Sequence, residues 1–213
     1  MLAARIYVEE ADVARRLEPF GVTRDELIRI VREVVGARAD AVDDDPLGTA
    51  GQFAYIYGTR HLRGTLRPKK YLRYREENIE AVKHPDRDLK IVYQSVDLAA
   101  SRSHEPRAIS GKGAGADRVI DAAQGSLFTD EELERLNPLT FGDINTGVWF
   151  FCVSVDGDKV CAELSLPHCI GGKNFKRFLE RIFIVNPGEW DGLKVAPAIN
   201  DDVVELEPKI SRR

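Results

Sequence analysis

The sequence predicts an α+β fold: one domain over residues 1–213, with helices packed on a mainly antiparallel sheet. A strong hairpin signal, Asp156-Gly157, separates two apolar segments of strand length. These segments, 148–155 and 159–166, must pair antiparallel because so short a turn reverses the chain. Helical and strand-like segments interleave elsewhere, but no two strand–helix–strand units of regular length occur. This irregular order favours α+β over a doubly wound parallel sheet.

Two helices are expected near the N-terminus. Residues 8–17 have a weak helical period and predict a short helix. A second helix is expected at about 24–35, where Thr23 and Glu26 have the spacing of a capping box and Gly36 is suited to end the helix. Apolar residues follow at helical spacing, namely Leu27, Ile30, Val31, Val34 and Val35.

The remaining elements follow from shorter patterns. Aromatic residues alternate over 52–57, and residues 89–98 form the strongest strand signal of the first half. The sheet is therefore expected to contain 52–57, 89–98, 148–155 and 159–166. Further helices are expected at 74–82, at 116–123, after the capping-box pair Thr129 and Glu132, and at 175–182.

The 148–155 strand is apolar on both faces, and it includes Trp149 and Phe151. Such a strand is expected where both faces of the sheet are covered. We therefore expect it in the centre of the sheet, with both of these side chains buried. Its turn is expected to place Asp156 and Gly157 at the two central positions, where glycine tolerates a positive φ.

Composition restricts the class of protein. The chain has 31 Lys+Arg against 35 Asp+Glu, and 43% of its residues are hydrophobic, which excludes a disordered tail and a collagen-like repeat. Three cysteines without a secretory signal indicate reduced thiols and a cytoplasmic location. No apolar run reaches membrane-helix length, so no membrane partner is expected. A weak domain boundary, if there is one, is expected in the polar loop at 101–117.

Residues 58–75 depart from this acidic balance, because they contain seven Lys and Arg residues and no acid. Gly64 and Pro68 favour a loop or a hairpin tip. Arginine and lysine bind phosphates, and tyrosine can stack on bases or support the residues that do. The candidate nucleic-acid-binding residues are Arg60, Arg63, Arg67, Lys69, Lys70, Tyr71, Arg73, Tyr74 and Arg75.

This basic segment has two alternative roles, and both stay open. The arginines can form a solvated edge that pairs with the acids Asp43 to Asp45, or they can bind a different anion, such as an acidic protein partner. The segment expected to be helical at 175–182 would extend the basic face if it lay nearby. Its positive residues, which also suit an ordinary surface helix, are Lys173, Lys176, Arg177 and Arg181.

A glycine-rich segment precedes the helix expected at 116–123. Exposed backbone N–H groups at a helix start can bind phosphate. The candidate phosphate-binding residues are Gly111, Lys112, Gly113 and Gly115. The spacing is not that of a Walker A loop, and a flexible linker or an ordinary helix entry is the favoured interpretation of this segment.

Asp88-Leu89-Lys90 has the D-x-K spacing found in metal-dependent nucleases, where a carboxylate holds Mg²⁺ and a lysine orients water. Glu77, Glu80 or Asp45 would have to supply the second carboxylate. This alternative is the only one that requires a cofactor, Mg²⁺, and solvated charges at a strand edge account for the same residues. The histidines have no metal-ligand spacing, so no other metal site is expected.

The sequence therefore predicts a cytoplasmic nucleic-acid-binding protein of a regulatory or mobile-element accessory type. A Mg²⁺-dependent nuclease and a module that binds an acidic protein are the alternatives. Whether the chain catalyses a reaction, whether it binds DNA or RNA, and whether it forms a homo-oligomer are left open.

Overall fold

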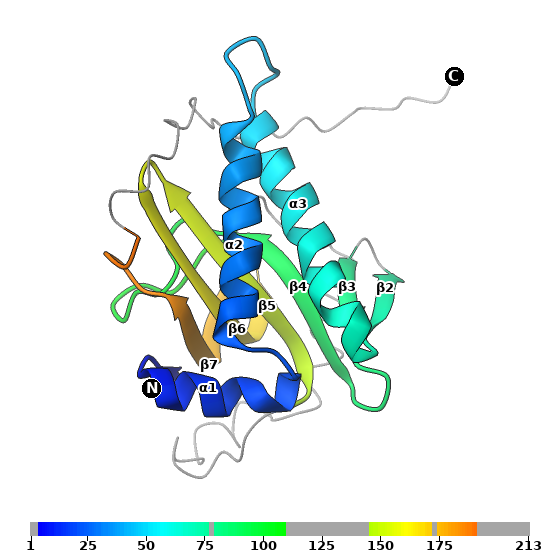
Figure 1. The fold of residues 1–213 in the computed structure, drawn as a ribbon. Coiled ribbons are helices and arrows are strands. Elements are labelled where there is room, and N and C mark those ends of the chain that lie inside the picture. Colours follow the sequence, from blue (N-terminus) through cyan, green and yellow to red (C-terminus); the bar gives the residue numbers. More distant parts are fainter. Residues whose placement is uncertain (1–3, 77–78, 110–144, 172–173, 191–213) are drawn as a thin grey trace.

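The fold is taken from a computed structural model that describes residues 4–76, 79–109, 145–171 and 174–190. Within these ranges, three α-helices lie on one face of a seven-stranded sheet (Figure 1). The predicted α+β class is therefore confirmed. The helices are α1 (Glu10–Leu17), α2 (Arg24–Ala39) and α3 (Thr49–Leu66), and two short 3-10 helices are η1 (Glu18–Phe20) and η2 (Arg67–Lys69).

The sheet is mixed and has the strand order β1-β7-β6-β5-β4-β3-β2. Two neighbouring pairs, β1 with β7 and β4 with β5, are parallel, and the others are antiparallel. The predicted mainly antiparallel sheet is thus only partly right. When two strands are joined by a long connection, their residue patterns do not show whether they run parallel or antiparallel. The strands are β1 (Arg5–Tyr7), β2 (Leu72–Glu76), β3 (Ile79–Lys83), β4 (Leu89–Ser95), β5 (Gly147–Asp156), β6 (Lys159–Gly171) and β7 (Asn174–Val185).

The two N-terminal helices are confirmed. The capping box of α2 is complete, since the Glu26 N–H donates to Thr23 Oγ1 at 3.2 Å and the Thr23 N–H donates to Glu26 Oε2 at 2.9 Å. Gly36 does not end α2 as predicted, because the helix continues to Ala39. Ala37 is buried in the same apolar face, and this packing outweighs the low helix propensity of one glycine.

The central hairpin is also confirmed. β5 is the fourth of the seven strands, and Trp149 and Phe151 are fully buried. The turn lies one residue later than predicted, because Asp156 pairs with Lys159 and leaves Gly157 and Asp158 as the central residues. Only Gly157 has a positive φ, of 57°. Glycine at the first central position is typical of a type II′ turn, which suits the twist of a hairpin.

The strand predicted at 52–57 is wrong, because these residues belong to α3. Alternating aromatic residues occupy the segment, but the buried positions follow the helical spacing of four. These buried positions are Ala50, Ala54, Gly58, Leu62 and Leu66, and Thr59 beside Gly58 is buried as well. Small and aliphatic side chains at that spacing let the helix lie close to the sheet, and the burial of this face outweighs the strand propensity of the aromatics.

The helices predicted at 74–82 and 175–182 are wrong, because these residues lie in β2–β3 and in β7. The apolar residues of β7 have the spacing of a helix for a geometric reason. Arg177, which lies between Phe175 and Phe178, has φ 53°, and this left-handed residue breaks the strict two-residue alternation of the strand. Phe175 and Phe178 therefore reach the same face although they are three residues apart. The helices predicted at 116–123 and after Thr129 lie outside the described residues.

We predict that Gly58→Ala lowers the free energy of unfolding by about 1–3 kcal/mol, because a side chain there overpacks the core. A Cβ at this position of α3 would lie 2.4 Å from the ring of Tyr93, which is itself buried in β4. Gly36→Ala in α2 is the matched control, since a Cβ there meets nothing within 4 Å. The control should raise stability by up to about 1 kcal/mol in urea unfolding. Equal effects of the two substitutions would contradict the close α3–β4 contact.

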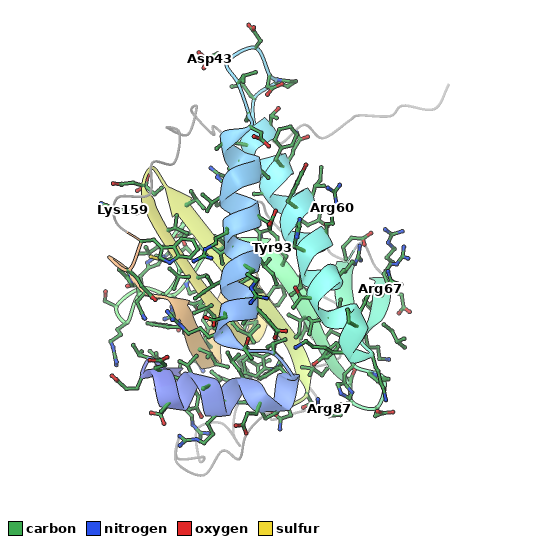
Figure 2. All side chains as sticks on the ribbon, viewed as in Figure 1. Asp43, Arg60, Arg67, Arg87, Tyr93 and Lys159 are labelled. Atoms are coloured by element: carbon green, nitrogen blue, oxygen red, sulfur yellow. The ribbon has the colours of Figure 1, made fainter. Side chains whose placement is uncertain are left out.

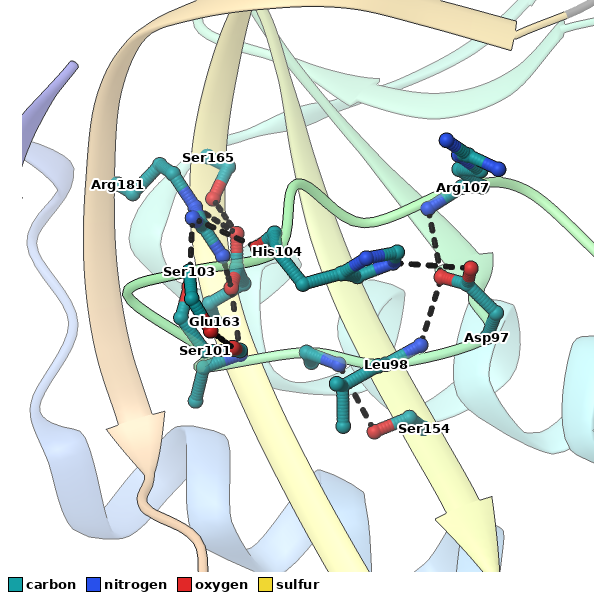
Figure 3. Close-up of polar contacts among 12 residues, drawn as sticks. Asp97, Leu98, Ser101, Ser103, His104, Arg107, Ser154, Glu163, Ser165 and Arg181 are labelled. Carbon is teal, nitrogen blue, oxygen red and sulfur yellow. Dashed lines mark hydrogen bonds and ion pairs between the residues drawn. The ribbon is translucent and has the colours of Figure 1, made fainter. Parts of the chain in front are cut away.

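The face of the sheet opposite the helices is contacted by the loop at 96–109. Two residues of this loop, Ala99 and Ala100, pack on the apolar side chains of that face. Beneath the loop, Glu163 of β6 and Arg181 of β7 form a buried ion pair, in which Arg181 Nη2 donates to Glu163 Oε2 at 2.6 Å (Figure 3). The predicted surface role of Arg181 is therefore wrong. Its guanidinium is used inside the fold, where it also donates to the carbonyl of Ser101 at 2.9 Å.

Candidate nucleic-acid interface

Helix α3 and strands β2 and β3 surround a pocket of about 820 Å³. Five of the predicted basic residues line it, and we call it the arginine pocket after Arg60, Arg63, Arg67, Arg73 and Arg75. Figure 2 shows Arg60 and Arg67 following α3 toward β2. The other lining residues are Tyr55, Ile56, Thr59, Gly64, Pro68 and Glu80.

Two periodicities bring the five arginines together. Arg60 and Arg63 are three residues apart on α3, and Arg67, four residues further on, is the C-cap of α3 and the first residue of η2, so the three lie on one side of this segment. Arg73 and Arg75 are two residues apart in β2, so they share the face of the sheet that α3 covers. The predicted loop or hairpin tip is thus wrong, and a helix followed by a strand places the charges in one pocket.

Among the residues that the structure describes, Glu80 is the one acid that lines the pocket. Arg63 Nη2 hydrogen-bonds to its Oε2, and Arg75 Nε donates to the same oxygen at 3.0 Å. Burial by itself would raise the pKa of Glu80, but the hydrogen bonds and charges of the two arginines outweigh it and lower the pKa below its ordinary value. Glu80 therefore stays ionised at neutral pH and holds Arg63 and Arg75 in place.

Arg60, Arg67 and Arg73, the other three arginines of the pocket, are not paired with Glu80. The guanidinium of Arg60 lies over the ring of Tyr57, 4.6 Å from its centroid. Arg67 and Arg73 are exposed, and neither forms an ion pair with any residue that the structure describes. Their charges are therefore open to a ligand.

Two polar atoms of the pocket wall have unused hydrogen-bonding capacity. Thr59 is 6% exposed, and its Oγ1 has no hydrogen-bond partner among the described residues. The same holds for Nε of Arg63, one helical turn further along α3. Both atoms are enclosed by the fold, so they lie behind the surface of the pocket rather than facing a ligand.

Exposed apolar groups lie on the same side of α3. Tyr55 and Ile56 are 45% and 44% exposed, and both line the pocket. Burial and the nearby charge of Glu80 raise the pKa of Tyr55, so its phenol stays protonated and neutral. These residues and Thr59 are absent from the predicted site because strand-like alternation assigned Tyr55 and Ile56 to a strand. The spacing of four between Tyr55, Thr59 and Arg63 is the signal that would have found them.

Four of the predicted binding residues do not line the pocket. Lys69 Nζ donates to Glu26 Oε2 at 2.7 Å and so joins η2 to the start of α2. Lys70 is exposed in a left-handed turn. Tyr71 and Tyr74 are buried, and the Tyr71 hydroxyl donates to the carbonyl of Phe20 at 3.0 Å. Because both rings are buried, they can support the neighbouring binding residues but cannot stack on a base.

The acids that the sequence offered as partners for the basic segment lie elsewhere. Asp43 is at the far end of the α2–α3 hairpin from Arg67 (Figure 2). Asp45 accepts a hydrogen bond from the N–H of Val42 within the same loop, at 2.9 Å. No described ion pair joins Asp43, Asp44 or Asp45 to the arginine pocket.

The residues of the nuclease alternative are not brought together. Asp88 and Lys90 pair with each other at 2.6 Å, and Lys90 Nζ lies over the ring of Tyr74. Lys90 therefore belongs to the face of the sheet opposite α3, whereas Glu80 faces α3. Glu77 lies outside the described residues. Within the described ranges, no group of three His, Cys, Asp or Glu side chains is arranged to hold a metal ion.

The other candidates are only partly described. The segment with Gly111, Lys112, Gly113 and Gly115 lies outside the described residues, as do Lys173 and the side chain of Lys176. Arg177 is exposed in β7. Among the described residues, therefore, only the arginine pocket gathers several predicted binding residues.

Comparison with protein-family models, curated proteins and solved structures finds no significant match. None of the described helices has the length and apolar character needed to cross a bilayer. Function is therefore inferred from the chain's own residues.

Proposed function

We propose that this protein binds nucleic acid and that the arginine pocket receives its phosphates. The observation that carries the proposal is the convergence of five arginines on one pocket, where Glu80 is the single carboxylate among the described lining residues. The whole chain has a formal net charge of -4, so this concentration of positive charge is local. Arginine forms bidentate hydrogen bonds with phosphate and is the preferred residue where such recognition is needed.

The exposed apolar residues favour nucleic acid over a simple anion. Tyr55 and Ile56 offer contact surface for a base or a sugar beside the charges of Arg60 and Arg63. Proteins that bind single strands combine a positive groove with such side chains. An acidic protein would supply carboxylates instead, and it remains the second candidate. Of the nuclease alternative, the described residues Glu80 and Lys90 face opposite sides of the sheet, and no observation favours it.

The location and biological role belong to the same proposal. Cys152 and Cys161 are buried and are not in a disulfide, which supports a reducing cytoplasmic location. A regulatory or mobile-element accessory role fits a binding protein of this size, and no particular residue supports it.

We predict that the double variant Arg67→Gln/Arg73→Gln weakens binding of a single-stranded oligonucleotide roughly 10–100-fold at moderate salt, because two charge-assisted contacts are lost. The slope of log affinity against log salt should flatten by about 1.4, since each contact to a single strand contributes about 0.7. Fluorescence anisotropy of labelled DNA and RNA oligonucleotides at several salt concentrations measures both effects.

The matched control is Arg29→Gln/Lys159→Gln, which removes the same charge from exposed positions in α2 and β6 that do not line the pocket. It should leave the slope unchanged. Equal losses in the two double variants would show that net charge, rather than the pocket, determines binding. Absence of salt-dependent binding by the wild-type protein would end the nucleic-acid proposal.

A further inference from the structure

The α2–α3 hairpin carries opposite charges at its two ends. Its tip, residues 40–47, contains four aspartates and no basic residue. The other end of the hairpin carries three exposed arginines of the arginine pocket, which we call the rim arginines: Arg60, Arg67 and Arg73. Asp43 and Arg67 lie at opposite ends of α3 (Figure 2), a helix of 18 residues that is about 27 Å long. The two groups of charges therefore cannot pair within one molecule.

The tip is held in shape by its own contacts. Asp45 Oδ2 accepts a hydrogen bond from the N–H of Val42 at 2.9 Å. Asp43 and Asp44 are exposed, and neither forms an ion pair with any residue that the structure describes. Val42 and Leu47 are 57% and 63% exposed, so the tip combines negative charge with apolar surface. A loop that is already ordered loses little entropy when it binds a partner.

The middle of α3 is apolar on the side of the pocket. Tyr55 and Ile56 are 45% and 44% exposed, and they lie between the tip and the rim arginines. The order along the hairpin is therefore acidic, apolar and basic. A surface with this order is complementary to a second copy of itself that is turned end for end about a twofold axis.

The spacing along α3 is consistent with such a twofold axis near Ile56. Arg67 lies about 16 Å from Ile56 along the helix axis in one direction. The first residue of α3, Thr49, lies about 10 Å from it in the other direction, and the tip extends beyond Thr49. A second hairpin in the opposite direction therefore brings each acidic tip to the rim arginines of the other copy.

The outer edge of β2 is the other surface suited to a second copy. β2 is the last strand in the sheet order, and no described strand pairs with its outer side. Antiparallel pairing of two β2 strands about Tyr74 would set Arg73 opposite the partner's Arg75. Like charges directly opposite each other destabilise a sheet, so the charges favour the hairpin over this edge.

We propose that two copies of this chain form a twofold dimer through their α2–α3 hairpins, with the tip of each copy in the arginine pocket of the other. Asp43 and Asp44 of one copy pair with the rim arginines of its partner, and Ile56 packs at the twofold axis. This inference does not rest on the proposed nucleic-acid binding. Because both interactions use the rim arginines, nucleic acid and the second copy exclude each other.

Sedimentation equilibrium of the full chain tests the dimer over micromolar to submillimolar protein concentrations. We expect a reversible monomer–dimer equilibrium that saturates at two copies and weakens as salt rises, because exposed charges are screened. A monomer throughout this range at low salt would overturn the proposal. A mass that continues to rise beyond two copies would indicate head-to-tail chains and would overturn the twofold arrangement.

Charge reversal tests which surfaces meet. The tip variant Asp43→Lys/Asp44→Lys and the pocket variant Arg67→Glu/Arg73→Glu should each dimerise at least roughly tenfold more weakly than the wild type, because like charges then meet at both ends. An equimolar mixture of the two variants should restore the dimer, since each end of the mixed dimer again pairs opposite charges. Restoration also excludes misfolding as the cause of the losses. A mixture that stays monomeric would overturn the proposal.

The apolar centre has its own test. Ile56→Asp should weaken the dimer roughly tenfold, because the twofold axis brings two added negative charges close together. Leu98→Asp is the matched control, since Leu98 is 41% exposed and lies in the loop at 96–109, on the other face of the sheet. It should leave the dimer unchanged. Equal losses in the two variants would show that net charge determines association, and the proposed interface would be wrong.

Competition with an oligothymidylate separates this inference from the proposed function. A saturating concentration should dissociate the dimer. A dimer that persists while the oligomer is bound through Arg67 and Arg73 would overturn the hairpin interface and leave the proposed function standing. Absence of oligomer binding by the monomeric tip variant at low salt would end the proposed function, and restoration of the dimer in the mixture would still establish the interface.

Discussion

Trp149→Ala is expected to lower the free energy of unfolding by about 3–5 kcal/mol, the range for removing a large aromatic side chain from a core. Trp149 is fully buried in the central strand β5. Its ring meets the ring of Phe20 edge to face at 4.8 Å, and the guanidinium of Arg16 lies 5.2 Å from its centroid. Its indole N–H donates to the carbonyl of Thr146 at 3.1 Å. The substitution therefore leaves a cavity between the helices and the sheet and removes a donor.

Urea unfolding measures this loss of stability. Far-UV circular dichroism is used to monitor it, because the substitution removes a tryptophan that fluorescence would otherwise detect. Trp149→Phe is the matched control, since it keeps most of the aromatic volume, and it should cost clearly less than the alanine variant. A cost below about 1 kcal/mol for Trp149→Ala would be typical of a surface position and would contradict the central placement of β5.

Glu163→Gln is expected to destabilise the protein by a comparable amount, about 3–5 kcal/mol, because it leaves the buried charge of Arg181 without its counter-charge. Glu163 is fully enclosed, and it accepts hydrogen bonds from the Arg181 guanidinium, from Ser165 Oγ at 2.6 Å and from the N–H of Ala100 at 2.6 Å (Figure 3). Arg181 in turn donates to the carbonyls of Ser101 and His104. One ion pair thus connects two strands to the loop at 96–109.

A double-mutant cycle isolates the pair from its surroundings. Arg181→Met combined with Glu163→Gln should cost less than the sum of the two single losses, by about 2 kcal/mol, because neither charge is then left unpaired. Amide hydrogen exchange gives a local readout, since the N–H of Ala100 should exchange faster in Glu163→Gln than in the wild type. Additive losses, or unchanged exchange at Ala100, would show that the pair does not hold the loop.

The elements that local residue patterns predicted correctly depend on interactions within a few residues. The α2 capping box closes between Thr23 and Glu26, and the β5–β6 turn requires a glycine at Gly157. In both cases the deciding contacts lie within one turn of the chain, so the residue pattern is sufficient. The burial of Trp149 also followed from a local pattern, because a strand apolar on both faces requires cover on both sides.

The elements that were predicted wrongly depend on distant partners. Residues 52–57 have strand-like alternation, but Gly58 fits α3 against Tyr93 of β4, and that contact is 35 positions away in the chain. β7 pairs with β6, and Arg177 within it has a left-handed φ, which places Phe175 and Phe178 on one face and gives the spacing of a helix. Neither partner is visible in a local window of sequence.

The same division applies to the candidate site. The concentration of positive charge in residues 58–75, without local acids, is readable from composition and does not depend on the fold. The packing of α3 against β2 and β3 selects which of these charges face one pocket. The fold also pairs Lys69 with Glu26, buries Tyr71 and Tyr74, and places Glu80 opposite Arg63. The physical reason is that charge is a property of each residue, whereas a binding site depends on which side chains a helix and a neighbouring strand turn toward each other.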